Sequence, residues 1–371
     1  MGKCKAIGKY ILNFLIILAI GALAIYLTVG KEFGSVLEAV RSAKLQFLAI
    51  MLGVMALYYL IDSFILYLIC KARGYRLKLK QTFVTNMTGV LFSDLTPSAT
   101  GGQFAQVYVF HNQGIHVGQA SGILTIVFIT YQIVIISYAT IAMLINASVI
   151  FQNRQSIWIA VIGFVVNIVI TGGFFLVTKS AKAHDFFVVK FIGFLSKIKL
   201  VKNYEKTSSE VREAFREFRD ESAQLFSQKK LFLEVCLCHV VKLTFFYTLP
   251  FFSAMSLGAP LSVSELPKYI SLAAAISLFN TFMPLPGASG GSEASFVMLF
   301  GFLGKTIVST AMIIWRVFTF YLGLLLSLIT VAFAKETKGG IMKAASGKDQ
   351  EIEQELEQET KEVNPQAGSA E

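Results

Sequence analysis

Pro284-Leu-Pro-Gly-Ala-Ser-Gly-Gly-Ser-Glu293-Ala294 decides the fold of this chain, because its pattern occurs a second time 189 residues earlier. The earlier copy reads Pro97-Ser-Ala-Thr-Gly-Gly-Gln-Phe-Ala105, and its proline, alanines and paired glycines coincide with those of the later copy. Proline and paired glycines break helices, and broken backbone at membrane depth is tolerated only where protein or a water-filled cavity surrounds it. Each copy interrupts an apolar run. The two copies therefore predict a membrane protein with an internal repeat and a central polar site.

The composition agrees with a membrane protein built of several apolar helices. Hydrophobic residues make up 55% of the 371 residues, charged residues only 15%, and the mean hydropathy is +0.64. The net charge of +10 comes from lysines and arginines in short loops beside apolar runs, which favours membrane orientation over nucleic-acid binding. The four cysteines form no disulfide framework or metal-ligand pattern. We expect no metal, no cofactor and no nucleic acid.

Six apolar runs are long enough to cross a bilayer as full helices. They cover residues 10–29, 45–70, 118–146, 158–177, 231–255 and 307–334. The basic segments 71–80 and 179–230 are assigned to the cytoplasm by the positive-inside rule, which places both chain termini there as well. The fold expected is all-α and polytopic.

The two motif segments lie between these crossings, and each must start and finish on one side of the membrane. Segment 82–114 starts from the cytoplasmic side and segment 267–304 from the outer side. The apolar arms of the second are too short for a bilayer core of about 30 Å. We interpret both as re-entrant hairpins related by an inverted repeat, although two short tilted spans would give the same sidedness.

The expected organisation therefore has four parts. Residues 1–178 form the first membrane repeat and residues 231–334 the second. Between them, residues 179–230 form a basic amphipathic cytoplasmic linker. Residues 335–371 form a disordered acidic tail rich in glutamate and glutamine.

Ionisable and polar residues inside the apolar runs are the candidates for function, because such groups are costly at membrane depth. Glu293 and Arg316 are the clearest pair, and half-helix starts after the paired glycines suit a phosphate. Asp62 and Asp94 are candidate relays, whereas Lys242 is interpreted as a structural residue that reaches toward the cytoplasmic face. The predicted substrate-binding residues are Pro97, Thr100, Gly101, Gly102, Gln103, Gln106, Pro286, Gly287, Gly290, Gly291, Glu293 and Arg316.

Structural explanations for the same residues stay open. Glu293 and Arg316 could form an ion pair that only holds a hairpin to a helix. Glu293 could also complement the dipole of the helix that it begins. The spacing of Thr100 and Gln103 fits a capping box, so Gln103 could simply cap a helix.

These motifs resemble those of the lysylphosphatidylglycerol synthase/flippase transmembrane region, the membrane part of the multiple peptide resistance factors. The resemblance covers about residues 10–334 and rests on the second motif, on Arg316, Thr319 and Tyr321, and on the Gly-Gly-Gln103 version of the first motif. Many relatives carry a charged pair where this chain has Gln103 and Gln106, which leaves the headgroup preference open.

The resemblance implies a bacterial multi-pass plasma-membrane protein that moves an anionic or aminoacylated phospholipid. The matched hairpins predict that it works by alternating access. Full-length relatives continue into a soluble aminoacyl-transferase domain, and we expect this chain to lack that catalytic role. Alternatives are a membrane component that acts on phosphatidylglycerol or a polyprenyl-phosphate sugar with a separate soluble transferase, and a scaffold that binds anionic lipid and a partner.

Overall fold

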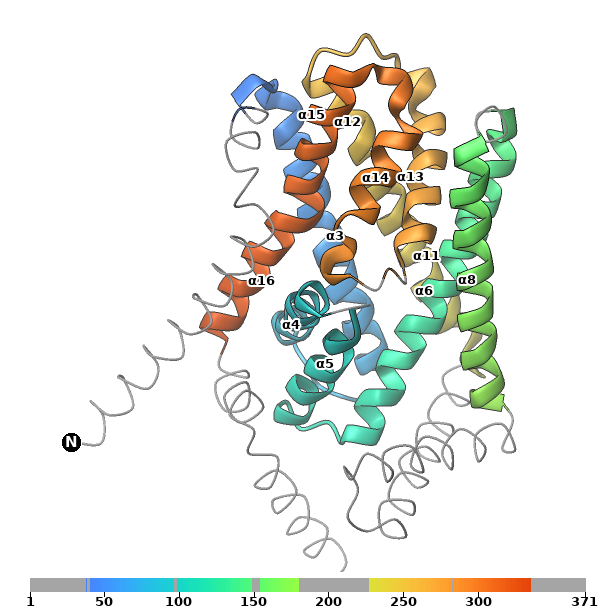
Figure 1. The fold of residues 1–371 in the computed structure, drawn as a ribbon. Helices are drawn as coiled ribbons and strands as arrows, with labels where there is room; N and C mark the ends of the chain where they lie inside the picture. The colour runs from blue at the N-terminus through green and yellow to red at the C-terminus, as the bar shows by residue number, and fades with distance from the viewer. Residues whose placement is uncertain are drawn as a thin grey trace, which may run out of the picture.

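The computed structural model describes residues 38, 41–96, 99–148, 154–179, 227–281, 283 and 285–334, with backbone alone for 154–156 and 174–179. These residues are almost entirely helical, and no strand occurs among them (Figure 1). The predicted span 10–29, residues 180–226 of the linker, the acidic tail 335–371 and Pro97 lie outside the described residues.

Within the described part of the chain, four stretches of helix are long and apolar enough to cross a membrane, which makes this a helical membrane protein. They are α3 (Leu45–Ala72), α6 (Val117–Ile145), the pair α11 (Lys229–Tyr247) and α12 (Leu249–Ser256), and the continuous stretch of α15 (Lys305–Arg316), η5 (Val317–Tyr321) and α16 (Leu322–Phe333). A further helix, α8 (Arg154–Lys179), contains the shorter apolar run Ile157–Gly173. Helices therefore occupy five of the six predicted spans.

Each predicted hairpin is a pair of helices joined by a short break. The first consists of α4 (Leu79–Leu95) and α5 (Thr100–Asn112), and the second of α13 (Leu266–Asn280) and α14 (Gly291–Leu299), with the one-turn helix η3 (Pro286–Ala288) in its break. At about 1.5 Å per residue these helices are shorter than a bilayer core of about 30 Å. Their lengths are those expected of hairpin arms.

The order of elements in the first half is repeated in the second. A long helix, two short helices and another long helix occur as α3–α4–α5–α6 and again as α11/α12–α13–α14–α15/α16. Figure 1 shows α3 descending while α11 and α12 rise, and α6 rising while α15 and α16 descend. A backbone hydrogen bond of 2.8 Å from Lys44 N to Ser256 O joins the start of α3 to the end of α12. Corresponding helices therefore run in opposite directions.

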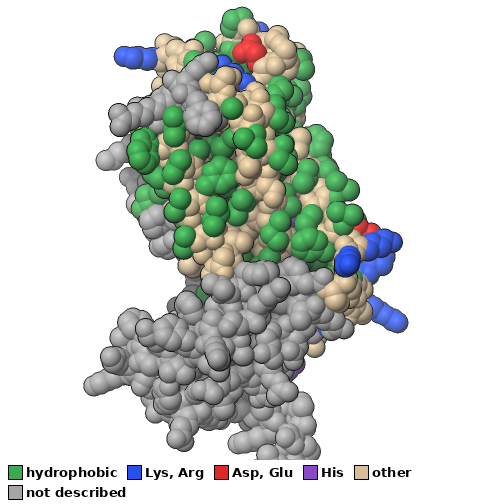
Figure 2. All heavy atoms as spheres, turned by 90° about the vertical axis from the view of Figure 1, so that its right-hand side faces the viewer, with side chains coloured by type: hydrophobic (Ala, Val, Ile, Leu, Met, Phe, Trp, Pro, Cys, Tyr) green, Lys and Arg blue, Asp and Glu red, His purple; other side chains and the backbone are tan. Residues whose placement is uncertain are grey.

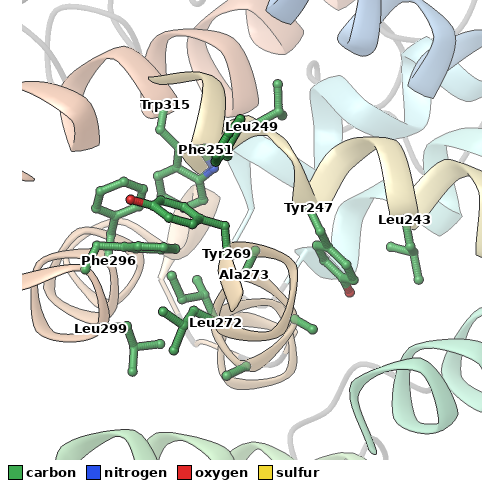
Figure 3. Close-up of a cluster of buried hydrophobic side chains, with 14 of the residues drawn as sticks. Leu243, Tyr247, Leu249, Phe251, Tyr269, Leu272, Ala273, Phe296, Leu299 and Trp315 are labelled. Carbon is green, nitrogen blue, oxygen red and sulfur yellow. The ribbon is translucent and has the colours of Figure 1, made fainter. Parts of the chain in front are cut away.

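A cluster of buried aromatic side chains holds the second hairpin against its neighbours (Figure 3). Tyr269 on α13 stacks on Phe300 with ring centroids 5.2 Å apart, and Phe296 on α14 lies 5.0 Å from the ring of Trp315 on α15. The outer surface is also apolar, but its hydrophobic side chains are exposed rather than packed against other helices. Exposed valines and isoleucines of α8 contribute to the hydrophobic face in Figure 2, as expected of a surface in contact with lipid.

Candidate functional site

The break in the first hairpin is stabilised by short-range contacts without charge. Ala99 adopts a left-handed backbone conformation with φ of 54°. The hydroxyl of Thr96 accepts a 2.9 Å hydrogen bond from Gly101 N–H, which satisfies one of the free donors at the start of α5. Gly102 lies so close to α4 that an added Cβ would come within 2.7 Å of the carbonyl oxygen of Gly89. The hairpin closes here because glycine allows the two helices to touch.

The break in the second hairpin repeats this backbone geometry. Ala288 has φ of 51°, and it lies 189 residues after Ala99, at the matching place in the motif. These two alanines are the described non-glycine residues with positive φ. A non-glycine residue rarely adopts this conformation, so its occurrence at both equivalent positions shows that the two motifs form the same kind of break.

Charged side chains, by contrast, support the second break. Glu293, in the first turn of α14, accepts a 2.6 Å hydrogen bond from Gly290 N–H. Arg316, at the end of α15, places Nε 2.7 Å from the other carboxylate oxygen, although without the alignment of a hydrogen bond. Its Nη2 donates to Gly287 O at 3.1 Å and to Ser289 Oγ at 3.3 Å. Both structural explanations for Glu293, the ion pair and the helix-start charge, are thus realised together.

The helix changes its winding immediately after Arg316. Residues Val317–Tyr321 form the π-helix η5, which is an irregularity found often at functional sites. The ring of Phe320, in this segment, lies 4.6 Å from the guanidinium carbon of Arg316 and packs on Gly287. The π-helix therefore presents an aromatic face to the arginine and to the break of the second hairpin.

Two adjoining cavities lie beside the two breaks. The first has a volume of about 340 Å³ and is bounded by α3, α4, α5, α6 and α11. The second has a volume of about 310 Å³ and reaches Ala99, Gly287, Ala288 and Arg316. Both are lined by Tyr58, Ser93, Asp94, Tyr131, Phe246 and Thr319. The breaks of both hairpins therefore border one cavity, and that cavity shares a wall with the other.

The first cavity contains an ion pair that the sequence analysis did not predict. Lys242 Nζ on α11 lies 2.5 Å from Asp62 Oδ1 on α3, and the lysine side chain is only 3% exposed. The centroids of the Tyr58 and Tyr131 rings each lie 5.0 Å from the same nitrogen. The prediction that Lys242 reaches toward the cytoplasmic face is wrong, because its ammonium is buried against Asp62.

The structure brings together only some of the predicted site residues. Asp62, Asp94, Gln103 and Gln106 line the first cavity; Asp94, Gly287 and Arg316 line the second. The others lie at helix starts beside the cavities without lining either one: Thr100, Gly101, Gly102, Pro286, Gly290, Gly291 and Glu293.

The alternative that Gln103 caps α5 is not seen among the described hydrogen bonds. The residue before α5, Ala99, makes no side-chain cap, and the N–H of Gly101 is capped by the hydroxyl of Thr96. At both breaks, one backbone N–H that was predicted to face a phosphate is already engaged, at Gly101 by Thr96 and at Gly290 by Glu293.

Tyr58 and Tyr131 line both cavities but carry no sequence signal as site residues, whereas Thr319 belongs to the motif that carries the family resemblance. Aromatic residues are abundant in this chain, with 33 phenylalanines and 13 tyrosines, so a tyrosine in an apolar helix does not stand out. Lys242 and Asp62 each stand out in the sequence as charged residues inside apolar runs, but 180 residues separate them. Within the described ranges no group of three or more His, Cys, Asp or Glu side chains could hold a metal ion.

Comparison with known proteins identifies the family. No curated protein matches the chain. The sequence model of the family described as "Lysylphosphatidylglycerol synthase TM region" matches residues 11–327, which include both hairpins, both cavities and Arg316. The chain belongs to the family of the lysylphosphatidylglycerol synthase transmembrane region.

Proposed function

We propose that this protein moves phospholipids between the two leaflets of the bacterial plasma membrane by alternating access. The family suggests a lipid-related membrane function. The observation that carries the finer proposal is the pair of adjoining cavities, which meet at a common wall next to the breaks of both hairpins. A pair of broken helices in corresponding halves is typical of the substrate site of repeat-built transporters.

The proposal treats the two halves as an inverted repeat with re-entrant hairpins. The opposite directions of corresponding helices and the left-handed alanines in both breaks support this interpretation. In such a repeat, small rocking of one half against the other opens a central site to each side in turn. The predicted cytoplasmic placement of both termini is part of the same proposal.

Asp94 and Arg316 supply opposite charges to the second cavity. Arg316 keeps donors for a phosphodiester, because no described residue accepts a hydrogen bond from its Nη1. No described residue donates to Asp94, so its carboxylate can receive a cationic group of a headgroup. Aminoacylated phospholipids carry a negative phosphodiester and a positive ammonium, whereas phosphatidylglycerol carries only the phosphodiester.

The test is leaflet exchange in liposomes that contain the purified protein. Fluorescent phosphatidylglycerol and its lysyl derivative are each added, and dithionite quenches the dye in the outer leaflet. We expect faster exchange than in empty liposomes and a loss of that gain in Asp94→Asn. Glu234→Gln is the matched control, because it neutralises a carboxylate on the exposed side of α11. Exchange that is no faster than in empty liposomes for both lipids would overturn the proposal and direct attention to a separate soluble transferase.

A further inference from the structure

The two ion pairs beside the cavities differ in how completely they are satisfied. Arg316 has two oxygen acceptors in addition to Glu293, and Glu293 receives the N–H of Gly290. Lys242 has three donor hydrogens, yet Asp62 is its only hydrogen-bond acceptor among the described residues. No other described residue donates to Asp62, whose side chain is 19% exposed on the cavity side.

A buried ion pair whose hydrogen-bonding groups are not all satisfied contributes little to stability. Burying two charges costs more free energy than their attraction returns unless further hydrogen bonds satisfy the groups that remain. Here the remaining sides of the ammonium face the rings of Tyr58 and Tyr131, which favour a cation but accept no conventional hydrogen bond. Both charged residues line the first cavity, so a ligand there can reach them.

Ligands of different charge would affect this pair differently. A phosphate that binds Lys242 would separate this lysine from Asp62. The Asp62 carboxylate would then be buried without a countercharge, which is strongly unfavourable. A headgroup that carries both a phosphate and an ammonium can replace both partners at once. Its phosphate meets Lys242, and its ammonium takes the place of Lys242 beside Asp62 and the tyrosine rings.

We propose that Lys242 and Asp62 are the residues that select headgroups by charge. They admit a headgroup that contains a phosphate and an ammonium and disfavour one that contains only the phosphate. This inference rests on the proposed lipid movement. It assigns the selection to the first cavity and to residues outside both repeated motifs, whereas Arg316 and Glu293 stay paired when a lipid binds.

The experiment compares two fluorescent lipids in the same liposomes, phosphatidylethanolamine with both charges and phosphatidylglycerol with the phosphate alone. The measured quantity is the ratio of their exchange rates above the rate in empty liposomes. We expect the wild-type protein to favour phosphatidylethanolamine by about tenfold, which corresponds to about 1.4 kcal/mol. Asp62→Asn leaves Lys242 without its countercharge, and the preference should reverse toward phosphatidylglycerol. Lys242→Gln should lower the exchange rate of phosphatidylglycerol below that in the wild type.

The double variant Asp62→Asn with Lys242→Gln is the control for misfolding of the single variants, because it leaves neither charge buried without a partner. It should move both lipids at similar rates. Lys230→Gln is the matched control, because it breaks a solvent-exposed pair with Glu234 on the same helix and should keep the wild-type ratio. Equal rates for both lipids in the wild type, or a wild-type ratio in Asp62→Asn and in the double variant, would overturn this inference and leave the proposed function standing. Movement of neither lipid would overturn this inference, and it would overturn the proposed function as well if lysyl-phosphatidylglycerol also failed to move.

Discussion

The two hairpin breaks have the same backbone conformation but differ in the side chains that stabilise it. Ala99 and Ala288 both adopt positive φ, at 54° and 51°. At the first break a threonine hydroxyl and close helix contact at Gly102 suffice. At the second, the Glu293–Arg316 pair and its hydrogen bonds join the hairpin to α15. The two breaks therefore have the same backbone shape, while among the described residues an ion pair supports only the second.

The largest effect is expected for Arg316→Ala. Removal of the guanidinium leaves Glu293 without its countercharge and Gly287 O without its donor. Loss of one partner of a buried pair costs about 3–5 kcal/mol, and lipid exchange should fall to the rate of empty liposomes. Thermal unfolding in detergent and the liposome assay measure the two effects. Wild-type exchange in this variant would show that charge at the second break is dispensable.

Glu293→Gln separates charge from capping. The amide oxygen of glutamine can still accept the N–H of Gly290, so the helix start should survive. The charge opposite Arg316 is lost, and we expect exchange to fall by about tenfold or more, with a monodisperse elution profile unchanged. Glu234→Gln serves as the control. If exchange in Glu293→Gln equals that of the wild type, the carboxylate acts only as a cap.

The first break should respond to volume rather than to charge. In Gly102→Ala the added methyl would press on Ser93 and on the carbonyl oxygen of Gly89, and the backbone there cannot easily yield. Overpacking of this kind costs about 1–3 kcal/mol. Gly172→Ala, on α8, is the control, since nothing lies within 4 Å of its added Cβ. Equal thermal stability of the two variants would refute the close packing of α4 and α5.

Thr96→Val is expected to have the smallest effect. It keeps the shape of the side chain and removes the hydroxyl that accepts from Gly101 N–H. Loss of such a cap costs about 1 kcal/mol, and thermal unfolding should report it. Because this hydroxyl does not line either cavity, the ratio of exchange rates for two lipids should stay the same. A changed ratio would mean that the first break takes part in selection.

The sequence allowed the helices and breaks to be predicted because they depend on local signals. Apolar runs, prolines and paired glycines marked five of the spans and both helix pairs, with every end within five residues of the observed one and most within two. The pairing of Glu293 with Arg316 was also predictable, because two opposite charges near one motif in an apolar setting have few other partners.

The first cavity could not be predicted in the same way. Lys242 and Asp62 meet only because α11 packs along α3, and no spacing within either helix indicates that contact. Nor could the sequence show that Tyr58 and Tyr131 flank the ammonium, since their side chains come from two further positions on α3 and α6. Long-range packing decides which polar residues share a cavity.

The most direct test of a single path through both cavities is the accessibility of Ser93, which lines their common wall. Ser93→Cys is introduced after the four native cysteines are replaced, and a membrane-impermeant thiol reagent is applied from each side of oriented liposomes. We predict modification from both sides and protection by added lipid substrate. Modification from one side only, in a protein that still exchanges lipid, would contradict the account.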